Sequence, residues 1–467
     1  MNDLTISLDV KSQEPLYEQI YHYIKSEILS GELPFKKRLP STRKLAEYLQ
    51  VSRTTVDLAY EQLVSEGYLE AVPYRGYFVC DLEGLYHFET KRPVQALRPV
   101  QESVCCTYDF SPSGVDLDSF PGNAWKKLSK EVLQEEDRKL FQLGDPQGEY
   151  ELRRTIAEYL HQARAVEAEP EQIIVGAGND FLLLLLCSMF GAGQKIAMES
   201  PTYKKAYDVF RNLSNEVRIV EMDESGMRVD LLEQTDAQIA YVMPSHQFPI
   251  GLVMPLKRRM QLLAWASSGE GRYIIEDDYD SEFRYKGKPI PALQGFDRAG
   301  RVIYIGTFSK SLAPAIRISY LVLPKALLSV YQQRGRIISS TVSRVDQRII
   351  AGFLDQGYFE RHLNKMRAVY RSRHDLLLEE LKAFRSFCSV SGEHAGVHLL
   401  LTFQNGMTEQ EAVELAAREG VRVCGLSRYF VGEAAGQPSH TVLLGYATLS
   451  EEEICEAVRR LKRAWIP

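Results

Sequence analysis

The sequence predicts an α/β protein in which a mostly parallel β-sheet is covered by helices on both faces. The main observation is a set of seven short apolar runs that alternate with helical stretches, the pattern of a sheet buried on both faces. A winged helix-turn-helix pattern precedes the sheet, and long amphipathic segments beyond about residue 330 predict a small C-terminal α+β subdomain. The apolar runs are 173–175, 195–198, 217–220, 238–243, 272–276, 301–306 and 318–323.

Residues 1–80 contain three predicted helices and a wing. Apolar residues recur every four positions in 15–30, which is typical of an amphipathic helix. Ser41 or Thr42 caps a second helix, and Ser52 caps a third. Two short strands then flank a turn at 73–75. Two helices with a tight turn and a wing form a winged helix-turn-helix.

Positive charge gathers in this region, although the whole chain has a formal net charge of −6. Residues 34–55 contain six basic side chains and one acidic side chain, a local charge of +5 (six minus one). A winged helix can serve as a protein-interaction module, but the local charge favours double-stranded DNA as its partner. The expected DNA-contacting residues are Ser41, Arg43, Ser52, Arg53, Thr54, Thr55, Arg75 and Gly76.

The rest of the composition predicts a cytoplasmic protein. Residues 81–107 show no sustained period and contain two prolines, so we expect a partly extended linker there. Seven scattered cysteines without a CxxC spacing argue against a disulfide framework or a metal site. No signal-peptide pattern is apparent, and the most apolar stretch, 181–190, is about half as long as a membrane span.

A lysine, a carboxylate and a phenol follow two of the predicted strands. Lys310 comes shortly after the strand 301–305, and Asp277 and Tyr279 follow the strand 272–276. Pyridoxal phosphate (PLP) needs an amine that binds its aldehyde, an acid beside its pyridine nitrogen and a hydroxyl beside its ring oxygen. A lone lysine is usually a solvated surface residue, but this context favours PLP as cofactor, with these three side chains as its catalytic groups.

Three segments carry a resemblance to known proteins: PSHQFPIG at 244–251, IEDDYDSEF at 275–283 and GTFSKSL at 306–312. Residues 108–467 resemble a fold-type I PLP-dependent aminotransferase, and residues 12–80 resemble a GntR-type winged helix. Together they resemble the MocR/GabR family of bacterial transcription regulators, and GabR-type sequences most closely.

The resemblance implies a role for each residue near the cofactor. Lys310 would hold PLP as an internal aldimine, Asp277 would pair with the protonated pyridine nitrogen, and Tyr279 would donate to the ring oxygen. Tyr203 matches the residue that stacks on the pyridine ring, although an aromatic residue in a packed loop gives the same pattern. His246 lies, with its neighbour Gln247, where aminotransferases carry an asparagine near the ring oxygen.

Hydroxyl and guanidinium groups suit the phosphate of PLP. The GAGN segment at 176–179 precedes a predicted helix, whose first N–H groups favour an anion. Alone, this segment is more often a simple strand-to-helix turn. The residues expected to bind the cofactor are Lys310, Asp277, Tyr279, Tyr203, Ala177, Gly178, Asn179, His246, Thr307, Ser309 and Arg317.

The expected effector is an amino acid or a small peptide. Arg428 matches the arginine that holds an amino acid's carboxylate, although an exposed structural arginine is the alternative. Lys204 and Lys205 stand where GabR-like sequences carry arginines, and a lysine lacks the planar fork, so the effector need not be 4-aminobutyrate. Leu143 stands where many relatives carry a tyrosine that reaches the partner subunit's phosphate.

Two functions agree with these features. The first is a PLP-dependent transcriptional regulator that senses an amine through external aldimine formation at Lys310. The second is a working aminotransferase with an attached DNA-binding module. A DNA-binding domain has little purpose on a housekeeping transaminase, so we expect the regulator with little or no turnover. We also expect a homodimer, because fold-type I sites lie at a subunit interface and a two-fold protein suits an operator with repeated half-sites.

Overall fold

The computed structural model describes residues 6–9, 12, 14–81, 106–134, 138–285 and 290–466. The chain divides into two compact units, Met1–Gln101 and Glu102–Pro467. Most of the linker expected at 81–107 lies outside the described residues. None of the described helices is long and apolar enough to cross a membrane.

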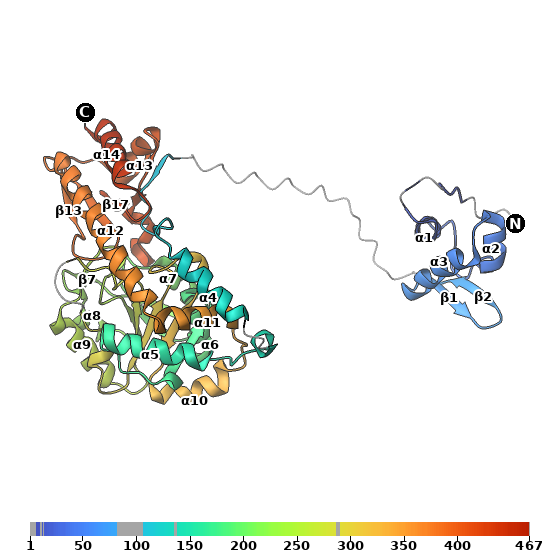
Figure 1. Ribbon diagram of the computed structural model, residues 1–467, viewed down its shortest axis with the longest axis horizontal. Coiled ribbons are helices and arrows are strands. Elements are labelled where there is room, and N and C mark those ends of the chain that lie inside the picture. Colours follow the sequence, from blue (N-terminus) through green and yellow to red (C-terminus); the bar gives the residue numbers. More distant parts are fainter. Residues whose placement is uncertain are drawn as a thin grey trace. The chain divides into compact units, whose positions relative to one another are not determined.

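The N-terminal unit is a three-helix bundle with a two-stranded wing (Figure 1). Its apolar core contains Ile20 and Ile24 of the first helix together with Val56 and Leu63 of the third. The two strands are antiparallel, and Tyr74 at the wing tip is fully exposed. The elements are α1 (Leu16–Leu29), α2 (Thr42–Leu49), α3 (Arg53–Ser65), β1 (Leu69–Val72) and β2 (Gly76–Val79).

The second unit is built on a seven-stranded sheet of order β4-β12-β11-β10-β9-β5-β6. Each of the seven predicted apolar runs forms one of these strands. Neighbouring strands are parallel except β12, which is antiparallel to both β11 and β4. The strands are β4 (Ile173–Gly176), β5 (Lys195–Met198), β6 (Glu216–Ile219), β9 (Ile239–Val242), β10 (Tyr273–Asp278), β11 (Val302–Thr307) and β12 (Ser319–Val322).

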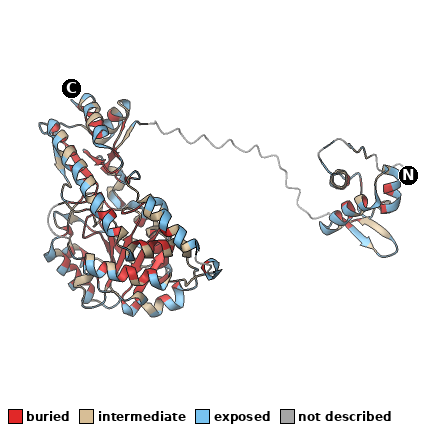
Figure 2. Ribbon diagram, in the orientation of Figure 1, coloured by how far each residue is buried: buried red, intermediate tan, exposed pale blue. Residues whose placement is uncertain are grey.

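Helices cover both faces of this sheet, and its central strands are buried (Figure 2). The side chains of β5 alternate between two core clusters, as the two-residue period of a strand requires. Ile196 and Met198 pack in the cluster that contains Leu182, whereas Ala197 packs in the cluster that contains Leu262. Leu182 lies on α6 (Asn179–Phe190), whose cluster also includes residues of α7 (Lys204–Asn212), and Leu262 lies on α9 (Leu256–Ser267). The helix α5 (Tyr150–Arg164) packs in a third cluster.

The C-terminal subdomain combines a four-stranded sheet of order β13-β14-β17-β16 with long helices. One of the predicted amphipathic segments forms the helix Tyr358–Leu381, which Gly357, with a φ of 66°, separates from the helix before it. The elements are α11 (Arg344–Asp355), α12 (Tyr358–Leu381), β13 (Cys388–Ser391), β14 (His398–Phe403), α13 (Glu409–Arg418), β16 (Cys424–Gly425), β17 (Thr441–Gly445) and α14 (Glu451–Trp465).

Short elements complete the second unit. The strand β3 pairs in parallel with β15, which connects the start of this unit to its C-terminal subdomain. The remaining strands and α-helices are β3 (Tyr108–Asp109), α4 (Gly122–Gln134), β7 (Met222–Asp223), β8 (Gly226–Met227), α8 (Val229–Leu232), α10 (Leu328–Val330) and β15 (Val421–Arg422).

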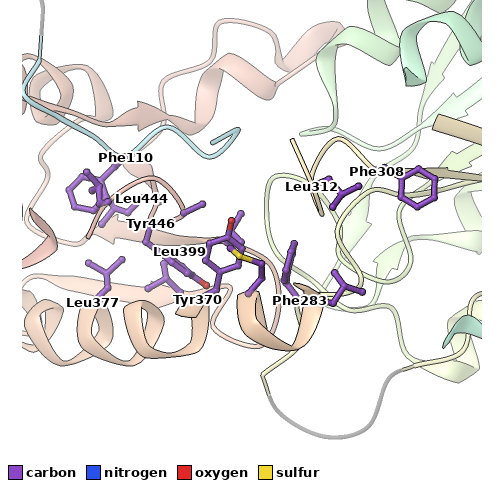
Figure 3. Close-up of a cluster of buried hydrophobic side chains, with 14 of the residues drawn as sticks. Phe110, Phe283, Phe308, Leu312, Tyr370, Leu377, Leu399, Leu444 and Tyr446 are labelled. Carbon is purple, nitrogen blue, oxygen red and sulfur yellow. The ribbon is translucent and has the colours of Figure 1, made fainter. Parts of the chain in front are cut away.

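One core cluster joins the C-terminal subdomain to the loop after β11. Tyr370 and Leu377 of α12 pack in it with Leu444 of β17, as Figure 3 shows. Phe308 and Leu312 of the loop belong to the same cluster. These two side chains are buried on either side of Lys310, so the core fixes the backbone that carries this lysine.

Candidate functional site

The Lys310 ammonium lies at the edge of the large sheet, just beyond the end of β11. Its Nζ donates to the carbonyl oxygen of Pro112 at 3.2 Å. Burial lowers the pKa of Lys310 to about 8, although nearby Asp280 raises it. A lysine with a lowered pKa is neutral more often and therefore more nucleophilic.

Asp277 lies on the adjacent strand at the same edge. The parallel register sets Asp277 opposite Ile305 of β11. Its carboxylate accepts hydrogen bonds from the Tyr241 hydroxyl at 2.5 Å and from Asn179 Nδ2 at 3.1 Å. Burial raises the pKa of Asp277 to about 7 despite these hydrogen bonds. A buried carboxylate of this kind gains most from a cationic partner such as a protonated ring nitrogen.

Tyr279 follows β10 and makes its polar contact with a histidine. Its hydroxyl oxygen lies 2.8 Å from Nδ1 of His246, and the same nitrogen lies 2.9 Å from a carboxylate oxygen of Asp280. Burial raises the pKa of Tyr279 well above its usual value, so the phenol stays protonated. Gln247, by contrast, donates to the carbonyl of Pro201 and is a structural residue of that loop.

Arg317 and the start of α6 form a cradle between β4 and β12. Gly178 has a φ of 88°, and a Cβ added there would lie 2.2 Å from Nη2 of Arg317. Only glycine therefore allows the guanidinium to approach this backbone. Arg317 Nη2 lies 3.2 Å from both the Ala177 carbonyl oxygen and Asp180 Oδ2, and the Ala177 N–H donates to Thr341 Oγ1 at 3.0 Å.

The hydroxyl groups of Thr307 and Ser309, at the end of β11 and just after it, differ in whether they have hydrogen-bond partners. Thr307 Oγ1 accepts from the Ser309 N–H at 3.2 Å and from Ser319 Oγ at 2.7 Å. Ser309 Oγ is buried and has no hydrogen-bond partner among the residues that the structure describes. A buried hydroxyl without a partner is costly, and a phosphate oxygen would satisfy it.

Backbone hydrogen bonds connect the loop of Tyr203 to the segment of Arg428. The Thr202 N–H donates to the Tyr429 carbonyl at 3.0 Å. Ser200 Oγ donates to the Val431 carbonyl at 3.2 Å and lies 3.1 Å from the Val431 N–H, which donates to it. We call these three bonds the 200–431 seam. It holds the expected stacking residue and the expected carboxylate-binding residue on neighbouring segments.

The side chains expected to meet an effector are exposed. Arg428 lies in the short helix Leu426–Tyr429 and faces solvent. Lys204 and Lys205 begin α7 and are also exposed. Lys204 already forms an ion pair with Asp208, with Nζ 2.8 Å from both carboxylate oxygens. Lys205 is thus the more available of the two cations.

These residues fit PLP. The site brings together an amine, a carboxylate that gains from a cationic partner, a protonated phenol and an Arg–Gly cradle suited to a phosphate. Three polar atoms at the site are buried without a partner among the described residues, and a ligand would complete their hydrogen bonding. They are Asn179 Oδ1, His246 Nε2 and Ser309 Oγ.

Several contacting residues were not expected from the sequence. Tyr241, Ser319 and Thr341 each hydrogen-bond a residue that was expected to bind the cofactor. His398 packs against His246, with ring centroids 5.4 Å apart. Each belongs to a different element from its partner, and no local motif marks it.

The N-terminal unit exposes most of the predicted DNA-contacting side chains. Ser41 and Ser52 cap α2 and α3 by accepting hydrogen bonds from the Lys44 and Thr55 N–H groups. The side chains of Arg43 and Arg53 are 81% and 69% exposed, and each forms an ion pair with an acid four residues later. Such surface pairs are weak and exchange readily for a phosphate.

The remaining predicted DNA-contacting residues lie on the first turn of α3 and on the wing. Thr54 is exposed on that turn, and Thr55 is partly exposed there. Arg75 stacks on Phe78 with its guanidinium carbon 5.8 Å from the ring centroid. Gly76 has a φ of 106°, a left-handed conformation that the turn of the wing requires.

Comparisons with known proteins match the two units of the chain to two different families. Residues 115–461 match the family described as aminotransferase class I and II, and residues 16–79 match the gntR family of bacterial regulatory proteins. The uncharacterised HTH-type transcriptional regulator YhdI of Bacillus subtilis (strain 168) is 40% identical over 100% of this chain and 99% of its own length. The probable rhizopine catabolism regulatory protein MocR of Rhizobium meliloti is 31% identical over 98% of this chain and 95% of its own length.

A solved aminotransferase structure is also similar to this chain. LysN, the α-aminoadipate aminotransferase of Thermus thermophilus, is 26% identical, with a TM-score of 0.68 over 78% of this chain and 95% of its own. That enzyme was crystallised with N-(5'-phosphopyridoxyl)-L-leucine. One family match covers most of the chain, and the similarity to MocR extends over its full length. The chain therefore belongs to the class I and II aminotransferase family and, within it, to the MocR-type regulators that carry a gntR-family helix-turn-helix.

Proposed function

We propose that the protein is a transcriptional regulator that binds double-stranded DNA through residues 1–80 and senses an amino acid or small peptide through PLP held in residues 108–467. The observation that carries the proposal is the convergence of Lys310, Asp277 and Tyr279 at one edge of the sheet. The full-length similarity to YhdI and MocR supports regulation rather than metabolism as the use of this site. The proposal includes a cytoplasmic location, where the protein meets DNA.

The residues of the site have different roles in holding the cofactor. PLP supplies an aldehyde that an amino group can capture. Lys310 would hold this aldehyde and would give way to the effector's amine, Asp277 would keep the ring nitrogen protonated, and Tyr279 would donate to the ring oxygen. Tyr203 would stack on the ring, and the remaining expected residues would hold the phosphate. These are Ala177, Gly178, Asn179, Thr307, Ser309 and Arg317.

The effector's carboxylate binds to Arg428, with Lys205 as the second cation. Arg428 offers paired donors that match a carboxylate. Lys204 contributes less, because the effector's carboxylate would have to replace Asp208 in its surface ion pair. The relation to GabR-type members is part of this proposal and rests on the three cofactor segments; the lysine pair argues for a different effector.

The protein acts as a homodimer on an operator with repeated half-sites. Large apolar side chains are exposed around the start of α11. Leu117 lines a surface hollow of about 420 Å³ together with Asp346 of this helix. Phe141 is near the same helix end, because Arg344 donates to the carbonyl of Lys139, two residues before Phe141. Leu117, Phe141 and Leu143 are 61%, 75% and 88% exposed. Exposed apolar surface of this kind favours a second copy of the chain.

A working aminotransferase is the second candidate. It is favoured by one observation, the presence of the lysine, the buried carboxylate and the phenol in a single site. These same groups would serve proton transfer in a full reaction.

One titration separates the two functions. The purified PLP-bound protein is mixed with a panel of amino acids and dipeptides while absorbance and keto-acid product are followed together. A spectral change without product, together with altered operator binding, supports the regulator and names its ligand. Steady product formation with no effect on DNA binding would show that the protein is an enzyme and not a regulator.

A further inference from the structure

The imidazole of His246 lies between two groups that follow β10. Its Nδ1 is 2.8 Å from the Tyr279 hydroxyl oxygen and 3.0 and 2.9 Å from the two carboxylate oxygens of Asp280. His246 and Asp280 are each only 2% exposed. One ring nitrogen therefore meets three oxygen atoms in a buried site.

The charges around Nδ1 determine where its proton lies. A neutral ring nitrogen either carries one proton or accepts one. An unprotonated Nδ1 would direct its lone pair at the Asp280 carboxylate, which is repulsive, whereas an N–H donates to it. Asp280 therefore holds the proton on Nδ1 of His246. The Tyr279 oxygen can then only accept from this nitrogen, and its own proton is free to point toward another acceptor.

The surrounding residues keep the ring in this position. A Cβ added to Gly396 would lie 2.0 Å from Cε1 of His246, so this glycine makes room for the imidazole. His398 packs beside the ring, and its Nε2 donates to the Pro249 carbonyl at 2.8 Å. Burial lowers the pKa of His398 to about 3, so it stays neutral.

Among the residues that the structure describes, few titratable groups face His246. Tyr279 and Asp280 contact it from the segment after β10, and His398 packs against it from β14. Lys310 adds a further charge, since it lowers the pKa of His398 and is itself influenced by Asp280.

We propose that His246 is a positioning residue that directs the Tyr279 hydroxyl proton toward the ring oxygen of PLP, with Asp280 fixing the tautomer of its imidazole. This inference rests on the proposed function, because it requires PLP bound to Lys310. A donated hydrogen bond stabilises the ionised ring oxygen, so it lowers the pH at which the lysine-bound cofactor changes protonation. The Asp280–His246–Tyr279 set thus determines which form of the cofactor the effector meets at neutral pH.

The test compares two variants of His246 by a pH titration of the absorbance of the PLP-bound protein. His246→Phe keeps a ring but removes the N–H, and the pH midpoint should rise by about one unit. His246→Asn places an amide N–H near the position of Nδ1, and its midpoint should stay close to that of the wild type. Cofactor content and far-UV circular dichroism report folding, and His246→Leu replaces His246→Phe if the latter does not fold.

A double variant shows whether the effect passes through the phenol. Tyr279→Phe should raise the midpoint by itself, and adding His246→Phe should then change nothing more. An unchanged midpoint in His246→Phe, or a full shift that persists in the Tyr279→Phe background, would overturn the inference. If the wild-type protein shows no lysine-bound absorbance, the proposed function itself fails, which is a different and recognisable result.

Discussion

The Tyr241 hydroxyl lies 2.5 Å from one carboxylate oxygen of Asp277, and both side chains are buried. This bond and the one from Asn179 favour the ionised carboxylate, but burial dominates and raises the pKa of Asp277 to about 7. Without a cofactor, the acid is therefore largely protonated below neutral pH. A protonated pyridine nitrogen beside it would reverse this balance.

The pH dependence of stability should differ between the cofactor-free and the PLP-bound protein. In the cofactor-free form, the pKa of Asp277 is about 7, above its ordinary value of 3.8. Between these values the folded state binds a proton that the unfolded state lacks, so this contribution to stability is complete below about pH 4 and is lost as the pH rises through 7. Bound PLP should remove this loss.

Chemical denaturation at several pH values measures this effect. Asp277→Asn is the matched control, because it keeps the shape of the side chain and has no proton to lose. The cofactor-free variant should lack the component of the pH dependence that Asp277 contributes. If the variant and the wild type lose stability in parallel between about pH 4 and 7, Asp277 is not the titrating group.

Lys310→Ala should abolish the visible-edge absorbance of the bound cofactor and the response to the effector. The fold should persist, because Phe308 and Leu312 still anchor the loop in the core. Absorbance spectra and a reporter-gene assay measure the two losses. Lys325→Ala, which removes an exposed lysine paired with Glu169, serves as control. A normal effector response in Lys310→Ala would contradict the sensing mechanism.

The double variant Arg43→Ala and Arg53→Ala should weaken operator binding at least about 30-fold, since each lost contact costs about 1–3 kcal/mol. PLP content should not change. A gel-shift assay at fixed salt measures the affinity. Arg371→Ala is the control, because Arg371 is also exposed and also pairs with an acid four residues later. Equal losses in both proteins would mean that general charge, not this surface, determines binding.

Gly178→Ala should weaken PLP binding about tenfold or more, because the added methyl group displaces the Arg317 guanidinium. Titration of the cofactor-free protein with PLP, followed by absorbance, gives the affinity. Gly193→Ala controls for backbone strain: Gly193 also has a positive φ, 79°, but no atom lies within 4 Å of its added Cβ. Similar affinities in the two variants would show that Arg317 is not a phosphate ligand.

The protein should form a homodimer in solution, and Leu143→Glu should weaken it, because Leu143 is 88% exposed beside the start of α11. Light scattering at micromolar concentration measures the molar mass. Leu213→Glu, which changes an apolar residue of lower exposure at the end of α7, is the control. A monomeric wild-type protein would remove the structural basis for a two-fold operator.

The sequence predicts the strands of the large sheet well because buried strands are short and apolar. An apolar run does not show in which direction its strand lies in the sheet, however, so the antiparallel orientation of β12 could not be predicted. The adjacency of Lys310 and Asp277 was predictable, since parallel strands end at one edge. The contact of Tyr241 with Asp277 was not, because a tyrosine within an apolar strand is typical of core packing.

The 200–431 seam has a mechanical consequence for signalling. Its three hydrogen bonds join the sheet domain to the segment that carries Arg428. Rotation of the C-terminal subdomain would have to break these bonds in order to separate the two segments, so the least costly movement pivots about them. An effector bound to Arg428 would then rotate the C-terminal subdomain about these hydrogen bonds. The angle between the subdomain and the sheet domain would change, while the distance between the two segments would stay the same.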